Sequence, residues 1–317
     1  MTRIREELSL GYRVGISGAA FSTGIGARTN LGLSMLCALS NVRLGYWRDS
    51  YVEPSRRPQW APSLRQRLAA SLTRWVFLVQ TCLLDELLAR FPGSAARRWY
   101  LSDGGHFENL GGYELIRRRL PRILVIDAEA DPQYKFEGLA NLVRKARLDF
   151  GAEITFLTGS ELDATVDPAF RKYFGTLQQL RRGKWSGALA GGEAGGPGLE
   201  LDVVDLERHS LAHAALARIV YEDEPERVSH LLYVKPTLTG DEPADITQYH
   251  GAHSTFPQEA TADQYFDEAQ WESYRRLGFE IASDLFHAAA SRSEKPGEGG
   301  GKLTPRDFLF DPSPHPK

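Results

Sequence analysis

The sequence predicts an α/β fold in which a mostly parallel β-sheet is flanked by helices. Between residues 99 and 157, three apolar segments of strand length alternate with two segments whose apolar residues recur at helical spacing. Helices that connect such strands cross over the sheet and make neighbouring strands parallel. The length of 317 residues, of which 42% are hydrophobic and 25% charged, suffices for a buried core without disulfides or metal ions.

The first hundred residues predict only a few regular elements. We expect a short strand over residues 13–16, followed by a glycine-rich loop that extends beyond Gly26. Apolar residues at helical spacing predict a helix over residues 31–42. Prolines make residues 50–63 an exposed connector, and a broad apolar stripe predicts a long helix over residues 64–91.

The central segment shows the clearest pattern. We expect a strand end, a loop, a short helix, a strand, a helix and a strand over residues 99–101, 102–112, 113–119, 122–128, 136–150 and 153–157. Ligands in parallel sheets bind beyond the carboxyl ends of the strands. Ser102, Asp103 and Asp127 are expected at such ends.

The last third of the chain predicts a hairpin and a helix between irregular segments. Residues 183–198 have the low complexity of a mobile surface loop. Residues 215–221 and 230–235 flank an acidic turn and predict the hairpin, and residues 262–288 predict a helical region rich in aromatic side chains. Residues 291–317 have the composition of a disordered tail.

Charge and cysteine content restrict the partners and the compartment. The 38 Lys and Arg residues against 41 Asp and Glu residues give a net charge of −3, which argues against nucleic acid as a partner. The two cysteines are far apart, which indicates a reducing compartment. The charged N-terminus does not resemble a signal peptide, and no apolar stretch reaches the roughly 18 residues of a membrane span. We therefore expect a protein of the cytoplasm or of the cytoplasmic face of a membrane, and not a secreted one.

The loop after residue 101 is the strongest candidate site. Asp103 follows a strand, and Gly104 and Gly105 allow a sharp turn that can leave its carboxylate facing a cleft, as a catalytic base requires. An Asp-Gly turn without any catalytic role is the alternative. His106 and Asn109 add polar groups to the same loop, which favours a site.

Ser17 is a second candidate, because residues 15–19 approach the nucleophile motif G-x-S-x-G. Ala19 stands in place of the final glycine, however. A nucleophile turn should also lead directly into a helix, whereas Gly24 and Gly26 follow here. These departures weaken the interpretation of Ser17 as a nucleophile.

Metal and dinucleotide sites have only weak support. His209 and His213 lie four residues apart, but the glutamate that zinc enzymes of the H-E-x-x-H type place after the first histidine is absent. We interpret them as surface or capping histidines. The carboxylates of residues 127–131 could hold a divalent cation or form an ordinary solvated loop. The glycines of residues 24–26 lack the third glycine of a dinucleotide motif, so we expect neither a metal nor a cofactor.

Several segments resemble the patatin-like and cytosolic-phospholipase-A-like acyl hydrolases, in particular a bacterial branch of that superfamily. SDGGHFENLGGYELIRRR, followed by a strand that ends in Asp, resembles the C-terminal half of their catalytic domain. Five further blocks occur in the same order and cover most of residues 11–280: SGAAFS, NVRLGYW, FEGLANLVRKARLDFG, LLYVKPTLTGDEPADI and TADQYFDEAQWESYRRLG. The resemblance implies that residues 1–290 form the C-terminal part of such a domain, without its first strands.

The resemblance also implies a reaction and its residues. In that family an Asp of a D-G-G motif acts as base for a Ser, and the match falls on Asp103. Residues 17–20, with Gly18 and Ala19, resemble a later segment that shapes the floor of the pocket, so the nucleophile is expected upstream and Ser17 is the weaker alternative. The implied substrate is a lipid acyl ester, with a membrane surface as a further partner. The missing N-terminal half of the same protein is a further expected partner. A noncatalytic, degenerate relative that binds lipid or a partner protein is the alternative.

Overall fold

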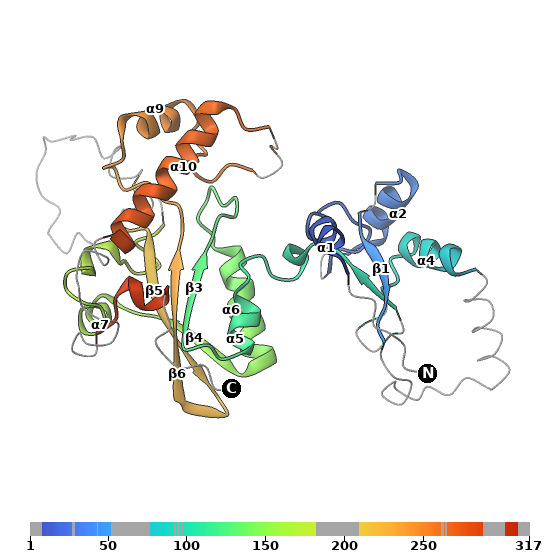
Figure 1. Ribbon diagram of the computed structural model, residues 1–317, viewed down its shortest axis with the longest axis horizontal. Coiled ribbons are helices and arrows are strands. Elements are labelled where there is room, and N and C mark those ends of the chain that lie inside the picture. The colour runs from blue at the N-terminus through green and yellow to red at the C-terminus, as the bar shows by residue number, and fades with distance from the viewer. Residues whose placement is uncertain are drawn as a thin grey trace, which may run out of the picture. The chain divides into compact units, whose positions relative to one another are not determined.

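The computed structural model describes residues 8–26, 29–42, 44–51, 77–91, 93, 96, 98–181, 209–260, 263, 265–287 and 302–309. The chain divides into two compact units, which are unit 1, Met1–Asn109, and unit 2, Leu110–Lys317. The division falls inside the segment of residues 1–290 for which the sequence predicts one domain. The helices and strands of both units are labelled in Figure 1.

Unit 1 combines three described helices with a two-stranded sheet. The helices are α1, Leu10–Ser17, α2, Leu31–Leu39, and α4, Leu78–Leu87. The strands β1, Tyr46–Asp49, and β2, Arg98–Leu101, pair in antiparallel fashion, with Trp47 opposite Tyr100. The expected helix over residues 31–42 and the strand end at residues 99–101 are confirmed, although that strand belongs to this two-stranded antiparallel sheet. Of the long helix predicted over residues 64–91, residues 64–76 lie outside the described residues, and α4 forms within the remainder.

The strand predicted over residues 13–16 is wrong, because these residues belong to α1. The side chain of Ser9 accepts a hydrogen bond from the backbone N–H of Tyr12 at 3.4 Å and so caps the helix. A run of four residues is too short for its apolar periodicity to distinguish a helix from a strand. The local cap therefore decides the conformation here.

Unit 2 contains a four-stranded mixed sheet, so the α/β class is confirmed. Its strands are β3, Arg122–Ile126, β4, Ala152–Phe156, β5, Ala214–Tyr221, and β6, Glu224–Val234, and they lie in the order β3-β6-β5-β4. β3 pairs with β6 in parallel, whereas β5 is antiparallel to both β6 and β4. The prediction of a mostly parallel sheet is wrong. The expected hairpin of β5 and β6 is confirmed, and it lies between the two strands that the sequence suggested as neighbours.

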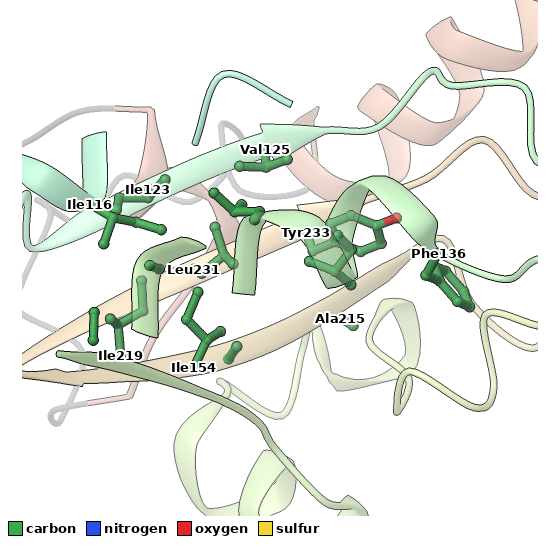
Figure 2. Packing of buried hydrophobic residues seen from close by; sticks show 14 of the residues in the cluster. Ile116, Ile123, Val125, Phe136, Ile154, Ala215, Ile219, Leu231 and Tyr233 are labelled. Atoms are coloured by element: carbon green, nitrogen blue, oxygen red, sulfur yellow. The ribbon is translucent and has the colours of Figure 1, made fainter. Parts of the chain in front are cut away.

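Helices cover both faces of this sheet. α5, Gly112–Arg117, and α6, Glu137–Phe150, pack on one face, and α7, Gly159–Thr165, α9, Ala244–Ala252, and α10, Glu268–Ala282, pack on the other. Alternate residues of β6 enter the two cores, with Leu231 and Tyr233 on the α6 side and Leu232 on the α10 side. Figure 2 shows Leu231, Ile219 and Ile154, from three neighbouring strands, gathered on one face. The sheet is thus buried on both sides.

Part of the segment expected as a disordered tail is ordered. Leu303 forms a parallel bridge with Val166, and a 3-10 turn follows over Pro305–Phe308. Thr304 and Asp307 cap this turn reciprocally, and Asp307 is buried, with one carboxylate oxygen 3.8 Å from Arg122. The low-complexity residues 183–198 lie outside the described residues.

A buried ion pair joins the carboxyl ends of β3 and β6. Lys235 Nζ lies 3.1 Å from Asp127 Oδ2, and the two side chains are 0% and 1% exposed. The hydroxyl of Tyr233 donates to the same oxygen. Burial, followed by the charge of Asp127, raises the pKa of Tyr233, so this hydroxyl keeps its proton. Asp127 is therefore enclosed in a structural network.

Lys235→Met tests how much this ion pair contributes to the stability of the fold. The substitution leaves a buried carboxylate without its cation, and we expect it to lower the free energy of unfolding by about 3–5 kcal/mol in urea titrations. Arg147→Ala breaks the exposed pair of Arg147 with Glu153 and serves as the matched control, without a comparable loss. Equal stability of Lys235→Met and the parent chain would contradict this assignment.

Candidate functional site

A cavity of about 770 Å³ lies within unit 1. Residues of α1, the glycine segment with Gly24, Gly26 and Thr29, β2 and the loop after β2 line it. Phe91, Trp99, Tyr100 and Phe107 make much of the wall aromatic. A concave, largely apolar space of this size is typical of a site for a small organic ligand.

Asp103 lines this cavity and also forms the turn at its edge. Its Oδ1 accepts a hydrogen bond from the backbone N–H of Gly105 at 2.8 Å, and the 3-10 turn Gly104–His106 follows. The Asp-Gly turn is therefore present, and the catalytic role of Asp103 stays a prediction. The turn fixes the carboxylate at one side of an apolar space, where a charged group can act on a bound ligand.

Only some of the other residues of the predicted site loop line the cavity. Gly104 and His106 line the cavity, whereas Gly105 and Asn109 are not among its lining residues. Gly105 instead donates its N–H to Asp103, and its Cα lies so close to Asn109 that an added Cβ would stand 2.6 Å from Oδ1. These two residues shape the turn.

Ser17 does not lie in the cavity wall. It is the exposed last residue of α1, Gly18 caps the C-terminal end of that helix, and neither lines the cavity. Ala19 is fully buried. The structure therefore does not bring Ser17 to Asp103 within the cavity. The near match to a nucleophile motif ends a helix, whereas a nucleophile turn would begin one.

The structure also brings together a couple on the same loop that the sequence did not predict. Ser102 Oγ lies 3.1 Å from His106 Nδ1, and both residues line the cavity. His106 Nε2 in turn lies 3.2 Å from the carbonyl oxygen of Ala20. A serine and a histidine four residues apart, on either side of a glycine turn, are the signal from which this couple could have been found.

A buried polar network supports this wall of the cavity. The hydroxyl of Tyr100, on β2, lies 2.9 Å from Ser22 Oγ and 3.0 Å from Thr23 Oγ1. Thr23 also donates to the buried carboxylate of Glu86 on α4, which accepts a second bond from Trp47 Nε1 on β1 at 2.8 Å. These bonds attach the segment before Gly24 to both strands of the small sheet.

Within the described residues, the histidines considered for zinc belong to no cluster of potential metal ligands. His213 is half-buried, with Nδ1 2.7 Å from the hydroxyl of Thr237, and burial lowers its pKa, so it is no surface or capping histidine. Within the described parts of the chain, no three His, Cys, Asp or Glu side chains gather as metal ligands would. Among the carboxylates of residues 127–131, Asp127 already holds Lys235.

Comparisons with protein-family models, curated proteins and solved structures found no match. In the portion of the chain that the structure describes, no helix combines the length and apolar character needed to span a membrane. The candidate site is therefore defined by its own geometry, namely an aromatic cavity with Asp103, Ser102 and His106 at its wall.

Gly26→Ala tests the fit between the glycine segment and the site loop. Gly26 has a φ of +61°, and an added Cβ would lie 2.8 Å from the carbonyl oxygen of His106. We expect a loss of stability of at least about 1–2 kcal/mol in urea unfolding. Gly15→Ala is the control, because its Cβ would meet nothing within 4 Å on helix α1. That variant should be unchanged or more stable, and a Gly26→Ala chain of equal stability would contradict the fit.

Proposed function

We propose that this chain takes part in the hydrolysis of lipid acyl esters as a relative of the patatin-like acyl hydrolases. The observation that carries this proposal is the position of Asp103, which stands on a D-G-G turn at the wall of an aromatic cavity. The resemblance of the surrounding residues gives this Asp the role of base for a serine hydroxyl. The cavity wall offers the apolar surface that an acyl chain needs.

The chemistry follows from these parts. A serine oxygen attacks the ester carbonyl after losing its proton, the alcohol leaves, and water then releases the acyl group. A fixed carboxylate beside an apolar space promotes the removal of that proton, because its charge is poorly screened there. The exposed position of Ser17 outside the cavity argues against this residue as the nucleophile.

A noncatalytic module that binds lipid is the second candidate. The observation that favours it is the exposure of large apolar side chains on unit 1, for example Leu10 on α1 and Leu36 and Leu39 on α2, at 77%, 65% and 75%. Such surfaces mark contact sites for lipid or protein. Binding to phosphatidylcholine vesicles without any release of fatty acid would favour this candidate.

Asp103→Asn tests the catalytic proposal on the full chain. The amide keeps the oxygen that accepts from Gly105 but removes the charge, and positioned acid–base groups contribute about 10²–10⁴ to rates. We expect kcat/KM for p-nitrophenyl butyrate and for dioleoyl phosphatidylcholine to fall at least about tenfold.

Asp167→Asn is the matched control. Asp167 Oδ1 accepts from the N–H of Ala169 at 2.8 Å in a turn of the same kind, and Asp167 lies in unit 2. This variant should hydrolyse both esters like the parent chain. Equal activity of Asp103→Asn and Asp167→Asn would contradict a catalytic role for Asp103.

A further inference from the structure

We infer that Arg13 selects acyl esters that carry a phosphate group as ligands of the unit 1 cavity. The inference rests on the proposed hydrolysis of acyl esters and names the residue that distinguishes charged from neutral substrates. Arg13 lies on α1 and lines the cavity, as Asp103 does. Among the described residues of the cavity wall, Arg13 is the one Lys or Arg and Asp103 the one Asp or Glu.

These two charges are held apart by separate backbone contacts. Asp103 Oδ1 accepts from the backbone N–H of Gly105 at 2.8 Å, and Arg13 Nε donates to the carbonyl oxygen of Leu8 at 3.0 Å. No ion pair joins Arg13 to Asp103 or to any other carboxylate that the structure describes. The cation and the anion therefore act on different parts of a bound ligand.

Arg13 can donate further hydrogen bonds, whereas two hydroxyls of the cavity wall cannot. Ser102 donates its one hydrogen to the carbonyl oxygen of Gly24 at 3.2 Å, and Thr29 donates its one hydrogen to that of Gly26 at 2.7 Å. Within the described part of the chain, the guanidinium of Arg13 uses only Nε. Its two terminal amino groups, Nη1 and Nη2, can donate in parallel to two oxygens of one anionic group.

The anionic group of a substrate fits at Arg13 and not at Asp103. A second negative charge beside the Asp103 carboxylate would be repelled, whereas a neutral ester can approach it. Hydrogen bonds from a guanidinium to a phosphate are charge-assisted and thus stronger than those to a neutral group. A phosphate monoester carries a charge of about −1.5 to −2 at neutral pH, which is more than a carboxylate carries. Phosphate is therefore the group that gains most from this site.

The exposure of the lining residues orients such a substrate. Arg13 is exposed and lines the cavity, which places it at the rim, where a phosphate keeps part of its hydration. Phe91, Trp99 and Tyr100 are only partly exposed and offer apolar surface to an acyl chain. With the chain on the aromatic side chains and the phosphate at Arg13, the ester between them lies within the cavity that Asp103 lines.

Two esters that differ only in the phosphate, 1-oleoylglycerol and 1-oleoylglycerol 3-phosphate, test this selection below the concentrations at which they aggregate. We expect the full chain to show a kcat/KM at least about tenfold higher for the phosphate ester, because the phosphate gains charge-assisted hydrogen bonds. Arg13→Gln removes the charge and should lower this ratio about tenfold. Arg13→Lys should retain part of the ratio, since it keeps the charge without the parallel donors.

Arg144→Gln is the matched control. Arg144 is an exposed arginine on α6 in unit 2, and its Nη2 donates to Asn141 Oδ1 at 2.8 Å. This variant should show the same ratio as the parent chain. Circular dichroism verifies that each variant is folded. Hydrolysis of both esters at a ratio that Arg13→Gln leaves unchanged would overturn the inference and leave the proposed function standing.

Binding of the corresponding ethers, which cannot be hydrolysed, separates the inference from the proposed function. In isothermal titration calorimetry, we expect the full chain to bind 1-O-oleylglycerol 3-phosphate at least about tenfold more tightly than 1-O-oleylglycerol, and Arg13→Gln to remove this difference. That result without hydrolysis of either ester would support the phosphate site and refute the proposed function. Inorganic phosphate lacks the acyl chain and should bind far more weakly than the ether phosphate. Equal affinity for inorganic phosphate would identify a site for the ion alone and overturn the inference.

Discussion

The buried ion pair of Asp127 and Lys235 is the constraint on which the architecture of unit 2 depends. The two residues follow β3 and β6, the one pair of neighbouring strands that run parallel in the described sheet. Removing both charges from water is costly, and only a close pairing compensates for it. The pair therefore requires the ends of β3 and β6 to meet, and the hairpin of β5 and β6 then occupies the middle of the sheet. The hydroxyl of Tyr233 is the third partner in this network.

Unit 1 uses polar contacts for a different purpose. The bonds of Tyr100 to Ser22 and Thr23 lie under the cavity wall, whereas Ser102, Asp103 and His106 line the cavity itself. Backbone carbonyls of Ala20 and Gly24 hold the side chains of His106 and Ser102. A carboxylate, an imidazole and a hydroxyl thus share one aromatic wall. These polar groups and the aromatic side chains therefore face one cavity of a size that suits a small organic ligand.

Local patterns predicted the single elements well. The helix over residues 136–150 and the strand over residues 122–128 appear within two residues of their expected bounds. The pattern of apolar residues that predicts each element is contained within the element itself. The hairpin was predictable because its strands are separated only by a short turn. The sheet order was not, since β3 meets β6 about a hundred residues later and no local pattern encodes that pairing. The strand predicted over residues 13–16 was wrong, because a run this short fits a helix and a strand equally well.

The sequence by itself determined the loop that carries the candidate site, because an Asp-Gly-Gly turn after a strand is a local property of the chain. It could therefore point to Asp103 and to the glycines that shape the turn. Only the tertiary structure decided which polar groups meet there. It joined His106 to Ala20 and Ser102 to Gly24, left Ser17 outside the cavity wall and enclosed Asp127 with Lys235. Contacts between residues far apart in the chain depend on packing, and packing is a property of the whole unit.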